Sequence, residues 1–479
     1  MPILRWGQDY DKAKLIDDSM AAVIVAIMLV PQALALALVA GLPPQVGLYA
    51  SIFGLSVYAL FGTSNTLSVG PVAVLSLMTA AALAKLGISD PPQLVAAALT
   101  LAFLSGVFLL LLGVMRLGFM ANFLSHPVIS AFITASAIII GLSQVQHLLG
   151  TTSSGQNIIE LLVSLRGSLG GINWITLGLG LASVAIIVWC RTGLASLLSK
   201  MGLGGRLVTS ISRSGPVVVA LLTGLLCYGF RLDQQGVQLL GVVPAGLPGL
   251  TVPDFSLDLI RDLFWSAILL SIIGFVESVS VAQTLAAKRR EQIELDQELI
   301  GLGAANIVVS FSGGLPVCGG FSRSVVNFDA GAATPAAGLM TAVLITCVAL
   351  MFTPILYWLP KVALASIILV AVYPLLNFSA LGKSWQYSKA DFGAVSITLF
   401  LTLLLGVEIG IASGVLASIL MHLYKTSRPH VAVIGRVAGT EHFRNVERHD
   451  VETFENILSI RIDESLYFAN TRFLEELVF

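Results

Sequence analysis

The sequence predicts an all-α polytopic membrane protein with about 14 transmembrane segments of the usual length. Hydrophobic residues make up 56% of the 479 residues, charged residues only 11%, and the mean hydropathy is +0.91. A soluble domain carries about 25% charged residues. Residues 19–84 contain no Asp, Glu, Lys or Arg, and these 66 residues can form three spans. A net charge of −1 without a basic patch excludes nucleic acid as a partner.

The remaining predicted spans follow in order along the chain. In the first half they lie at about 93–114, 124–146, 172–190 and 215–230, and in the second half at about 259–286, 299–312, 323–334, 336–358, 362–375, 391–407 and 409–424. Spans 1–7 therefore occupy about residues 15–231, and spans 8–14 about residues 258–425.

Basic residues between the spans set the expected orientation. Arg116 follows span 4, and Arg206 and Arg213 lie between spans 6 and 7. Lys288 follows span 8, and Lys383 lies between spans 12 and 13. All five fall on one side of the membrane if both termini are cytoplasmic, as cytoplasmic loops are enriched in Lys and Arg. We expect this orientation in the inner (plasma) membrane of the cell.

The charge density changes near Lys425. Of the 53 charged residues (26 basic and 27 acidic), 15 lie in residues 426–479, about 28% of that segment, and 38 in residues 1–425, about 9%. We therefore expect a transmembrane domain at 1–425 and a cytoplasmic segment at 426–479. No metal site, cofactor or enzyme activity is predicted, because the four cysteines lack CxxC spacing and nucleotide-binding and hydrolase motifs are missing from the sequence.

Two segments break the helical pattern where a span should begin. Residues 62–71 read GTSNTLSVGP, and residues 313–323 read GGLPVCGGFSR. Irregular backbone at membrane depth is tolerated only where protein buries it or where it lines a cavity. We expect a short extended segment followed by a half-helix at each break, in spans 3 and 10.

The two breaks have equivalent positions in the two halves of the chain. Pro31 and Gln32 are expected to interrupt span 1, and Pro71 opens span 3 about 40 residues later. Glu277, with the serine that follows it, is expected to interrupt span 8, and Ser322 opens span 10 about 45 residues later. Span 1 enters from inside and span 8 from outside, which predicts two inverted seven-span repeats.

Inverted repeats would bring the N-termini of half-helices 3 and 10 together near the membrane midplane. Unpaired N–H groups and roughly half a positive charge at each end would make an anion site. The expected binding residues at these two ends are Gly70, Val72, Ala73, Ser322, Arg323 and Ser324. The serines would bring hydroxyl donors, and the arginine would bring a cation.

Each charged or amide candidate also has a structural interpretation. Arg323 either attracts the anion, forms an ion pair with Asp329 or Glu277, or extends toward the membrane surface. Desolvation favours the neutral form of Glu277, which makes it a candidate proton carrier; the alternative is permanent pairing with Arg323 or a backbone donor. Gln32 either donates its amide to the anion or satisfies backbone groups freed by the adjacent proline. Glu408 is expected to be structural, at the outer membrane boundary.

At these residues the chain resembles the SulP anion permease family, whose animal members include prestin and pendrin. The matching segments, in order, are residues 30–37 (VPQALALA), 40–49 (AGLPPQVGLY), 61–64 (FGTS), 67–78 (LSVGPVAVLSLM), 274–282 (GFVESVSVA), 297–306 (QELIGLGAAN) and 321–327 (FSRSVVN). Residues 457–475 resemble the opening strands and first helix of a STAS domain, which we expect to be either truncated here or a natural remnant. Alternating apolar residues at 457–462 fit a half-buried strand.

The resemblance implies a core domain and a gate domain, an elevator-like movement of the core, and a homodimer. It also implies an anion site formed by spans 1, 3, 8 and 10. The residues carried over by the motifs are Gln32, Leu36, Val72, Ala73, Glu277, Ser322 and Arg323, and Ser278 is a further expected binding residue. Many relatives have an aromatic residue at the position of Leu36, so this cavity would be wider or less polarised. The segment around Glu277 is more similar to proton-linked sulfate permeases than to the sodium-linked bicarbonate branch.

These observations predict a secondary active transporter for a small inorganic anion, with sulfate favoured, that works in the lipid bilayer by alternating access. Protons are the expected coupling ion and sodium the alternative. Within the same family, bicarbonate and C4-dicarboxylates are the alternative substrates. Other classes left open are an uncoupled anion channel or exchanger, a nucleobase symporter of the same architecture, and a membrane scaffold or sensor without flux.

Overall fold

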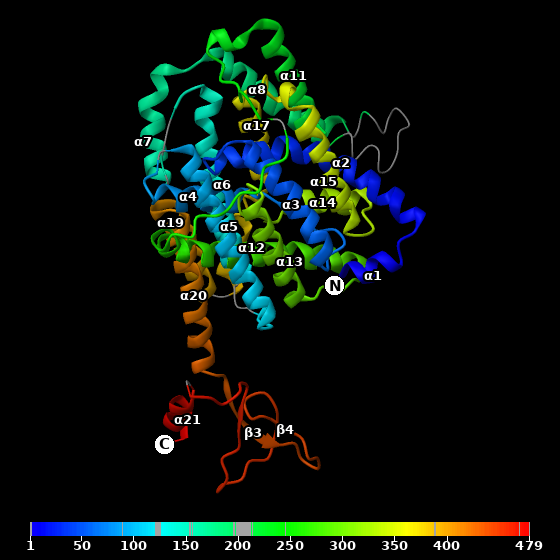
Figure 1. Ribbon diagram of the computed structural model, residues 1–479. Helices are drawn as coiled ribbons and strands as arrows, with labels where there is room; N and C mark the ends of the chain where they lie inside the picture. The colour runs from blue at the N-terminus through cyan, green and yellow to red at the C-terminus, as the bar shows by residue number, and fades with distance from the viewer. Residues whose placement is uncertain are drawn as a thin grey trace.

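The computed structural model describes residues 2–88, 90–119, 126–152, 157–194, 214–244, 246–387, 389–468 and 470–478, together with residues 155, 197 and 212. Figure 1 shows a helical bundle from which one long helix, α20 (Val407–Ser427), leads to a small C-terminal segment. Among the described residues, six helices are long and apolar enough to cross a membrane. They are α2 (Lys12–Val39), α5 (Pro91–Val114), α6 (His126–Leu149), α8 (Trp174–Trp189) with the turn after it, α12 (Leu257–Arg289) and α20.

Shorter helices fill the rest of the bundle. The apolar ones are α3 (Gln45–Phe61), α4 (Ala73–Ala84), α11 (Gly215–Phe230), α15 (Ala336–Met351), α17 (Lys361–Val372) and α19 (Lys389–Leu405). Two more, α13 (Leu295–Phe311) and α14 (Phe321–Ala330), coincide with predicted spans 9 and 10. Helices α1 (Pro2–Gln8), α7 (Ile158–Ser168) and α18 (Ser379–Tyr387) lie outside the predicted spans. The chain is thus a mostly helical membrane protein. Arg206 and Arg213 of the orientation argument lie outside the described residues.

Both predicted breaks contain a short strand followed by a helix. β1 (Val69–Gly70) precedes α4, and β2 (Cys318–Gly319) precedes α14. The strands pair antiparallel, with Val69 opposite Gly319 and Gly70 opposite Cys318. Pairing between strands from the two halves of the chain satisfies backbone groups that lipid could not satisfy. It also brings the beginnings of α4 and α14 to the same region of the bundle.

Helices α2 and α12 are continuous, so the prediction that they are interrupted at Pro31 and at Glu277 was wrong. A proline within a helix removes one backbone hydrogen bond and crowds the preceding turn. Packing of α2 against α3, α14, α15 and α17 holds the helix through this defect. A glutamate and a serine fit a helix without changing its geometry. The Ser278 hydroxyl donates to the carbonyl oxygen of Gly274, 2.5 Å away, one turn earlier.

Small residues allow α5 and α13 to pack closely. A Cβ added to Gly106 would lie 2.7 Å from the backbone nitrogen of Ile307, and one added to Gly303 would lie 2.7 Å from that of Leu110. Close helix approach through glycine is typical of membrane bundles, where dispersion rather than water exclusion drives helix association. Gly303 is therefore a packing residue.

The C-terminal segment forms a three-stranded antiparallel sheet. Its strands are β3 (Val431–Arg436), β4 (Phe443–Asn445) and β5 (Ile460–Ile462), in the order β4-β3-β5, and helix α21 (Thr471–Val478) follows. Ile460 and Ile462 are half-buried and Arg461 is exposed, which confirms the predicted alternation at 460–462 only; Ile457 and Leu458 are exposed, at 63% and 60%, and lie outside the strand. Figure 1 shows this segment at the far end of α20, away from the bundle.

Candidate functional site

A cavity of about 50 Å³ lies where the two paired breaks meet α2, α12 and α17. It is lined by Gln32, Leu36, Pro71, Val72, Ala73, Glu277, Gly320, Phe321, Ser322, Arg323, Ile368, Ala371, Val372 and Leu375. The structure therefore brings together seven of the predicted site residues from four helices, namely Gln32, Leu36, Val72, Ala73, Glu277, Ser322 and Arg323.

Two helix N-termini line this cavity. α4 begins after Val72 and α14 after Gly320, and both of these residues have extended backbone and supply no side-chain cap. The amide N–H groups of a first helical turn have no partner within the helix. Each end also carries roughly half a positive charge from the helix dipole. The backbone alone thus makes this cavity favourable for an anion.

Arg323 is buried at the cavity wall, with 1% of its surface exposed. Its Nη1 donates to the carbonyl oxygen of Pro71 at 2.5 Å, which fixes the guanidinium across the start of α4. Its Nε and Nη2 have no hydrogen-bond partner among the described residues. Within the described part of the chain it forms no ion pair with Glu277 or Asp329, so the structural ion-pair interpretation is not observed. A buried cation with free donors is suited to bind an anion.

Glu277 and Gln32 bring two further polar side chains to the cavity. Glu277 is only 9% exposed, and its Oε2 has no hydrogen-bond partner among the described residues. The Oε1 of Gln32 is buried without a partner in the same part of the chain. Burying such acceptors without hydrogen bonds is costly. A protonated carboxyl, a water molecule or a bound ligand would each reduce that cost.

Three other predicted site residues support the scaffold and do not line the cavity. The Ser278 hydroxyl accepts from the Gly319 N–H at 2.8 Å and so holds β2 against α12. The Ser324 hydroxyl accepts from the Ser68 N–H at 2.9 Å and donates to the Gly320 carbonyl at 2.7 Å. Gly70 lies beside the arginine, and a Cβ there would be 3.4 Å from Nη2. These residues fix the positions of the two helix N-termini.

The apolar wall of the cavity was not predicted. Ile368, Ala371 and Val372 belong to α17, and Leu375 belongs to the 3₁₀ turn that follows it, Tyr373–Leu375. An apolar residue in an apolar span carries no sequence signal that separates a cavity wall from a lipid-facing position. Only the tertiary arrangement identifies these four residues.

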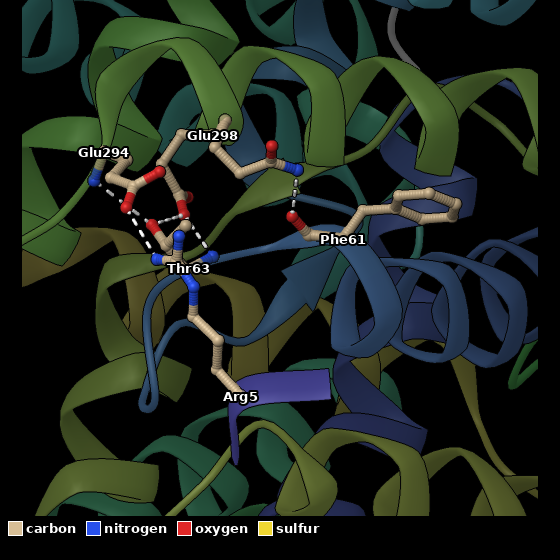
Figure 2. Close-up of polar contacts among 6 residues, drawn as sticks. Arg5, Phe61, Thr63, Glu294 and Glu298 are labelled. Atoms are coloured by element: carbon tan, nitrogen blue, oxygen red, sulfur yellow. Dashed lines mark hydrogen bonds and ion pairs between the residues drawn. The ribbon is translucent and has the colours of Figure 1, made fainter. Parts of the chain in front are cut away.

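Glu298 is a second buried carboxylate, and the sequence analysis gave it no role. Figure 2 shows its side chain directed from α13 toward Thr63, in the loop that leads from α3 to β1. Its Oε1 accepts from the N–H of Thr63 at 2.7 Å, from the Thr63 hydroxyl at 2.6 Å and from the N–H of Ser64 at 3.2 Å. The Tyr58 hydroxyl donates to Oε2 at 2.7 Å. These bonds fix the irregular backbone that positions the start of α4.

The same loop is held at its edges by neighbours of Glu298. Gln297 donates its Nε2 to the carbonyl oxygen of Phe61 at 2.7 Å, and Glu294 pairs with Arg5 of α1 at 2.8 Å (Figure 2). The Glu294–Arg5 pair is exposed, with 59% and 80% of the side chains accessible, so it contributes little stability. The buried cluster around Glu298 therefore carries most of the restraint.

Glu408 has the structural surroundings that were predicted for it. The Ser266 hydroxyl of α12 donates to its Oε1 at 2.9 Å, and Lys85, at the end of α4, pairs with its Oε2. The contact joins α4 and α12 to α20. Glu408 itself is 7% exposed, whereas Lys85 is more than half exposed.

Comparison with known proteins agrees with this geometry. The model of the family described as "Sulfate permease family" matches residues 15–398. The chain is 34% identical over 478 residues to sulfate transporter 4.1, chloroplastic, of Arabidopsis thaliana, covering 99% of this chain and 68% of that protein.

Two solved structures share the fold. The structure of SLC26A9 superposes with a TM-score of 0.91 at 25% identity, covering 100% of this chain and 76% of that one. The transmembrane domain of the cyanobacterial bicarbonate transporter BicA superposes with a TM-score of 0.72 at 22% identity, covering 86% and 98%. The family consists of transporters, which is consistent with the lack of enzyme motifs. With its family model matched over most of its length, the chain belongs to the sulfate permease family.

Proposed function

We propose that this protein is a secondary active transporter that imports sulfate together with protons. The observation that carries the proposal is a single cavity in which two helix N-termini meet Arg323 and Glu277. The name of the Arabidopsis relative gives sulfate as the anion to test first. Sulfate oxygens are acceptors only, so they match the free Nε and Nη2 of Arg323, the first-turn N–H groups and the Ser322 hydroxyl.

Glu277 supplies the coupling in this proposal. When it is ionised, its charge opposes that of Arg323, and the cavity has no net side-chain charge. When it is protonated, the cavity carries one net positive charge and binds an anion more tightly. Anion and proton therefore favour each other's binding, and a coupling of this kind is worth about 1–3 kcal/mol between sites. Sodium near the carboxylate would act in the same direction.

The membrane potential makes such coupling useful. At 100 mV, negative inside, each charge moved costs about 2.3 kcal/mol, so sulfate faces about 4.6 kcal/mol on entry. Two accompanying protons would cancel that electrical term, and their chemical gradient would drive accumulation. Glu277 is a single carboxyl and carries one of these protons. A second proton carrier is therefore required if sulfate and two protons enter together.

The architecture proposed with this function is two inverted seven-span repeats that together form a core domain and a gate domain. The protein would be a homodimer in the inner membrane, with both termini on the cytoplasmic side. α2, α4, α12 and α14 would form the moving part that carries the anion. α17 would belong to the static part and supply the apolar wall of the cavity. Residues 426–479 would be the start of a cytoplasmic STAS domain.

The direct test is uptake of radiolabelled sulfate into proteoliposomes with and without an inward proton gradient. The proposal expects uptake that the gradient increases and that a protonophore abolishes. An inward sodium gradient at constant pH is the matched control for the coupling ion. Protein that is folded but takes up no sulfate under any of these conditions would contradict the proposal.

Bicarbonate is the second candidate substrate, with C4-dicarboxylates behind it. Its support is the shared fold of the bicarbonate transporter BicA, together with Leu36, which lines the cavity where the family resemblance implies an aromatic side chain. Competition against labelled sulfate by unlabelled bicarbonate, succinate and uracil separates these substrates. An electrical current that corresponds to far more ions per protein than a turnover of about 1–10³ s⁻¹ would instead indicate an uncoupled channel.

A further inference from the structure

A second, smaller cavity lies at the opposite end of α17 from the first. Its volume is about 10 Å³, and it is formed by the end of α6, the beginning of α8, the beginning of α17 and Gln238. It shares no lining residue with the larger cavity. Lys361 lines the small cavity and Ile368 lines the large one, about 10 Å further along the same helix at 1.5 Å per residue.

Two buried hydroxyls in the small cavity have nothing to bond with in the described part of the chain. They belong to Thr151 and Thr176, whose residues are 9% and 2% exposed. A buried hydroxyl that makes no hydrogen bond costs free energy, and two at one place indicate a shared partner. The threonines come from different elements, since Thr151 follows α6 and Thr176 lies in the first turn of α8.

The charge around these hydroxyls is positive. Lys361 is the cation that lines the cavity, beside the His147 ring, and no Asp or Glu lines it among the described residues. The N-termini of α8 and α17 add the positive ends of two helix dipoles, although Asn173 Oδ1 accepts from the Thr176 N–H and the Lys361 N–H donates to the carbonyl oxygen of Gln238. The α6 C-terminus is the opposing dipole, but two of its last carbonyls are already bonded. The oxygen of Gln146 accepts from the Thr151 N–H, and that of Leu149 accepts from the Asn173 N–H, both at 2.9 Å.

From this arrangement we propose that the small cavity binds a single small inorganic anion, a halide such as chloride, separately from the transported anion. Both threonine hydroxyls would donate to the ion, and Lys361 would balance its charge. A volume of about 10 Å³ has room for about one water-sized particle, which favours a monoatomic ion over sulfate. Because Lys361 begins the helix whose far end forms the apolar wall of the large cavity, a bound halide would fix the position of α17.

The test is thermal unfolding of the purified full-length protein in sodium chloride against sodium gluconate at equal ionic strength. Arg323→Gln is included because it removes the main cation of the large cavity. A chloride-dependent rise in Tm that remains in this variant therefore comes from binding outside the large cavity. The double variant Thr151→Val/Thr176→Val removes the two hydroxyls at constant shape. Thr223→Val is its control, because the hydroxyl of Thr223 bonds only within its own helix.

We expect chloride at about ten times its Kd to raise the Tm by about 2 °C or more in the wild type, in Arg323→Gln and in Thr223→Val. The double valine variant should unfold at the same temperature in both salts, and Lys361→Gln should need more chloride for the same rise.

Equal Tm values in chloride and gluconate for Arg323→Gln would overturn the proposal and leave a bridging water as the partner of the hydroxyls. A chloride effect unchanged in the double valine variant would also overturn it. Sulfate uptake is not used as a readout, so failure here is distinct from failure of the proposed transport.

Discussion

At the residue scale, the polar side chains of the cavity could be predicted from the sequence, and its apolar ones could not. Arg323 and Glu277 stand out because charged residues inside apolar spans are rare and costly. Ser278 and Ser324 stand beside them in the same motifs, yet their hydroxyls hold the two strands. A motif marks the neighbourhood of a site, but the partner of each hydroxyl depends on tertiary contacts that a sequence does not encode locally.

Glu277→Gln should separate binding from coupling. Glutamine has nearly the same shape as a protonated glutamate, so the cavity would keep its net positive charge at every pH. We expect labelled sulfate to exchange across the membrane in counterflow at a rate that no longer depends on pH. Accumulation driven by a proton gradient should be lost. Glu464→Gln, at an exposed position of the C-terminal segment, is the control and should behave as the wild type. Gradient-driven accumulation that survives in Glu277→Gln would exclude Glu277 as the proton carrier.

At the element scale, the helices and the two breaks were predicted because their signals are local. Long apolar runs predict spans, and glycine and proline at membrane depth predict irregular backbone. The prediction failed at Pro31, where the usual disruption of a helix by proline predicted an interruption of span 1. Packing against neighbouring helices keeps α2 continuous there. The loop restraint by Glu298 was also missed, because its partners Tyr58 and Thr63 are more than 230 residues away in the chain.

Glu298→Ala should destabilise the protein strongly, because it leaves the buried N–H groups of Thr63 and Ser64 without their acceptor. Each buried unsatisfied group costs about 1–3 kcal/mol, so a loss of about 3 kcal/mol or more is expected. Glu294→Ala, at the N-cap of the same helix, breaks only the exposed pair with Arg5 and should cost less than about 1 kcal/mol. Thermal unfolding of both variants makes the comparison. Equal small effects would show that the cluster does not hold the loop.

Gly303→Ala should lower stability by about 1–3 kcal/mol, because its Cβ would lie 2.7 Å from the backbone nitrogen of Leu110. Gly178→Ala in α8 is the matched control, since nothing lies within 4 Å of its Cβ. Alanine there should raise helix stability by up to about 1 kcal/mol. The two variants thus have opposite expected signs in the same unfolding assay. A stabilising Gly303→Ala would contradict the close packing of α5 and α13.

At the scale of the whole molecule, membership in the sulfate permease family follows from motifs spread along the chain. The proposed movement depends instead on contacts between elements. The contact of Glu408 with Lys85 and Ser266 joins α4 and α12 to α20. If α4 and α12 move relative to α20 during transport, this contact must open in each cycle.

A covalent link between α4 and α20 at this contact should stop sulfate transport without stopping sulfate binding. We expect a Lys85→Cys/Glu408→Cys variant, made with Cys347→Ser to remove the exposed native thiol, to lose sulfate uptake when treated with a bifunctional thiol reagent. Sulfate binding should remain, and each single cysteine variant should be insensitive to the reagent. Full uptake after complete crosslinking would mean that α4 and α20 do not move apart.

The central claim is that the anion binds at the two helix N-termini beside Arg323. Equilibrium binding of labelled sulfate to the purified wild type, Arg323→Gln and Arg261→Gln tests it most directly. Arg261 is an exposed arginine of α12, so its variant is the control for loss of one positive charge. Hydrogen bonds to a charged group are worth about 1.5–3 kcal/mol, so Kd should rise at least about 10-fold in Arg323→Gln and stay unchanged in Arg261→Gln. An unchanged Kd in folded Arg323→Gln would contradict the account.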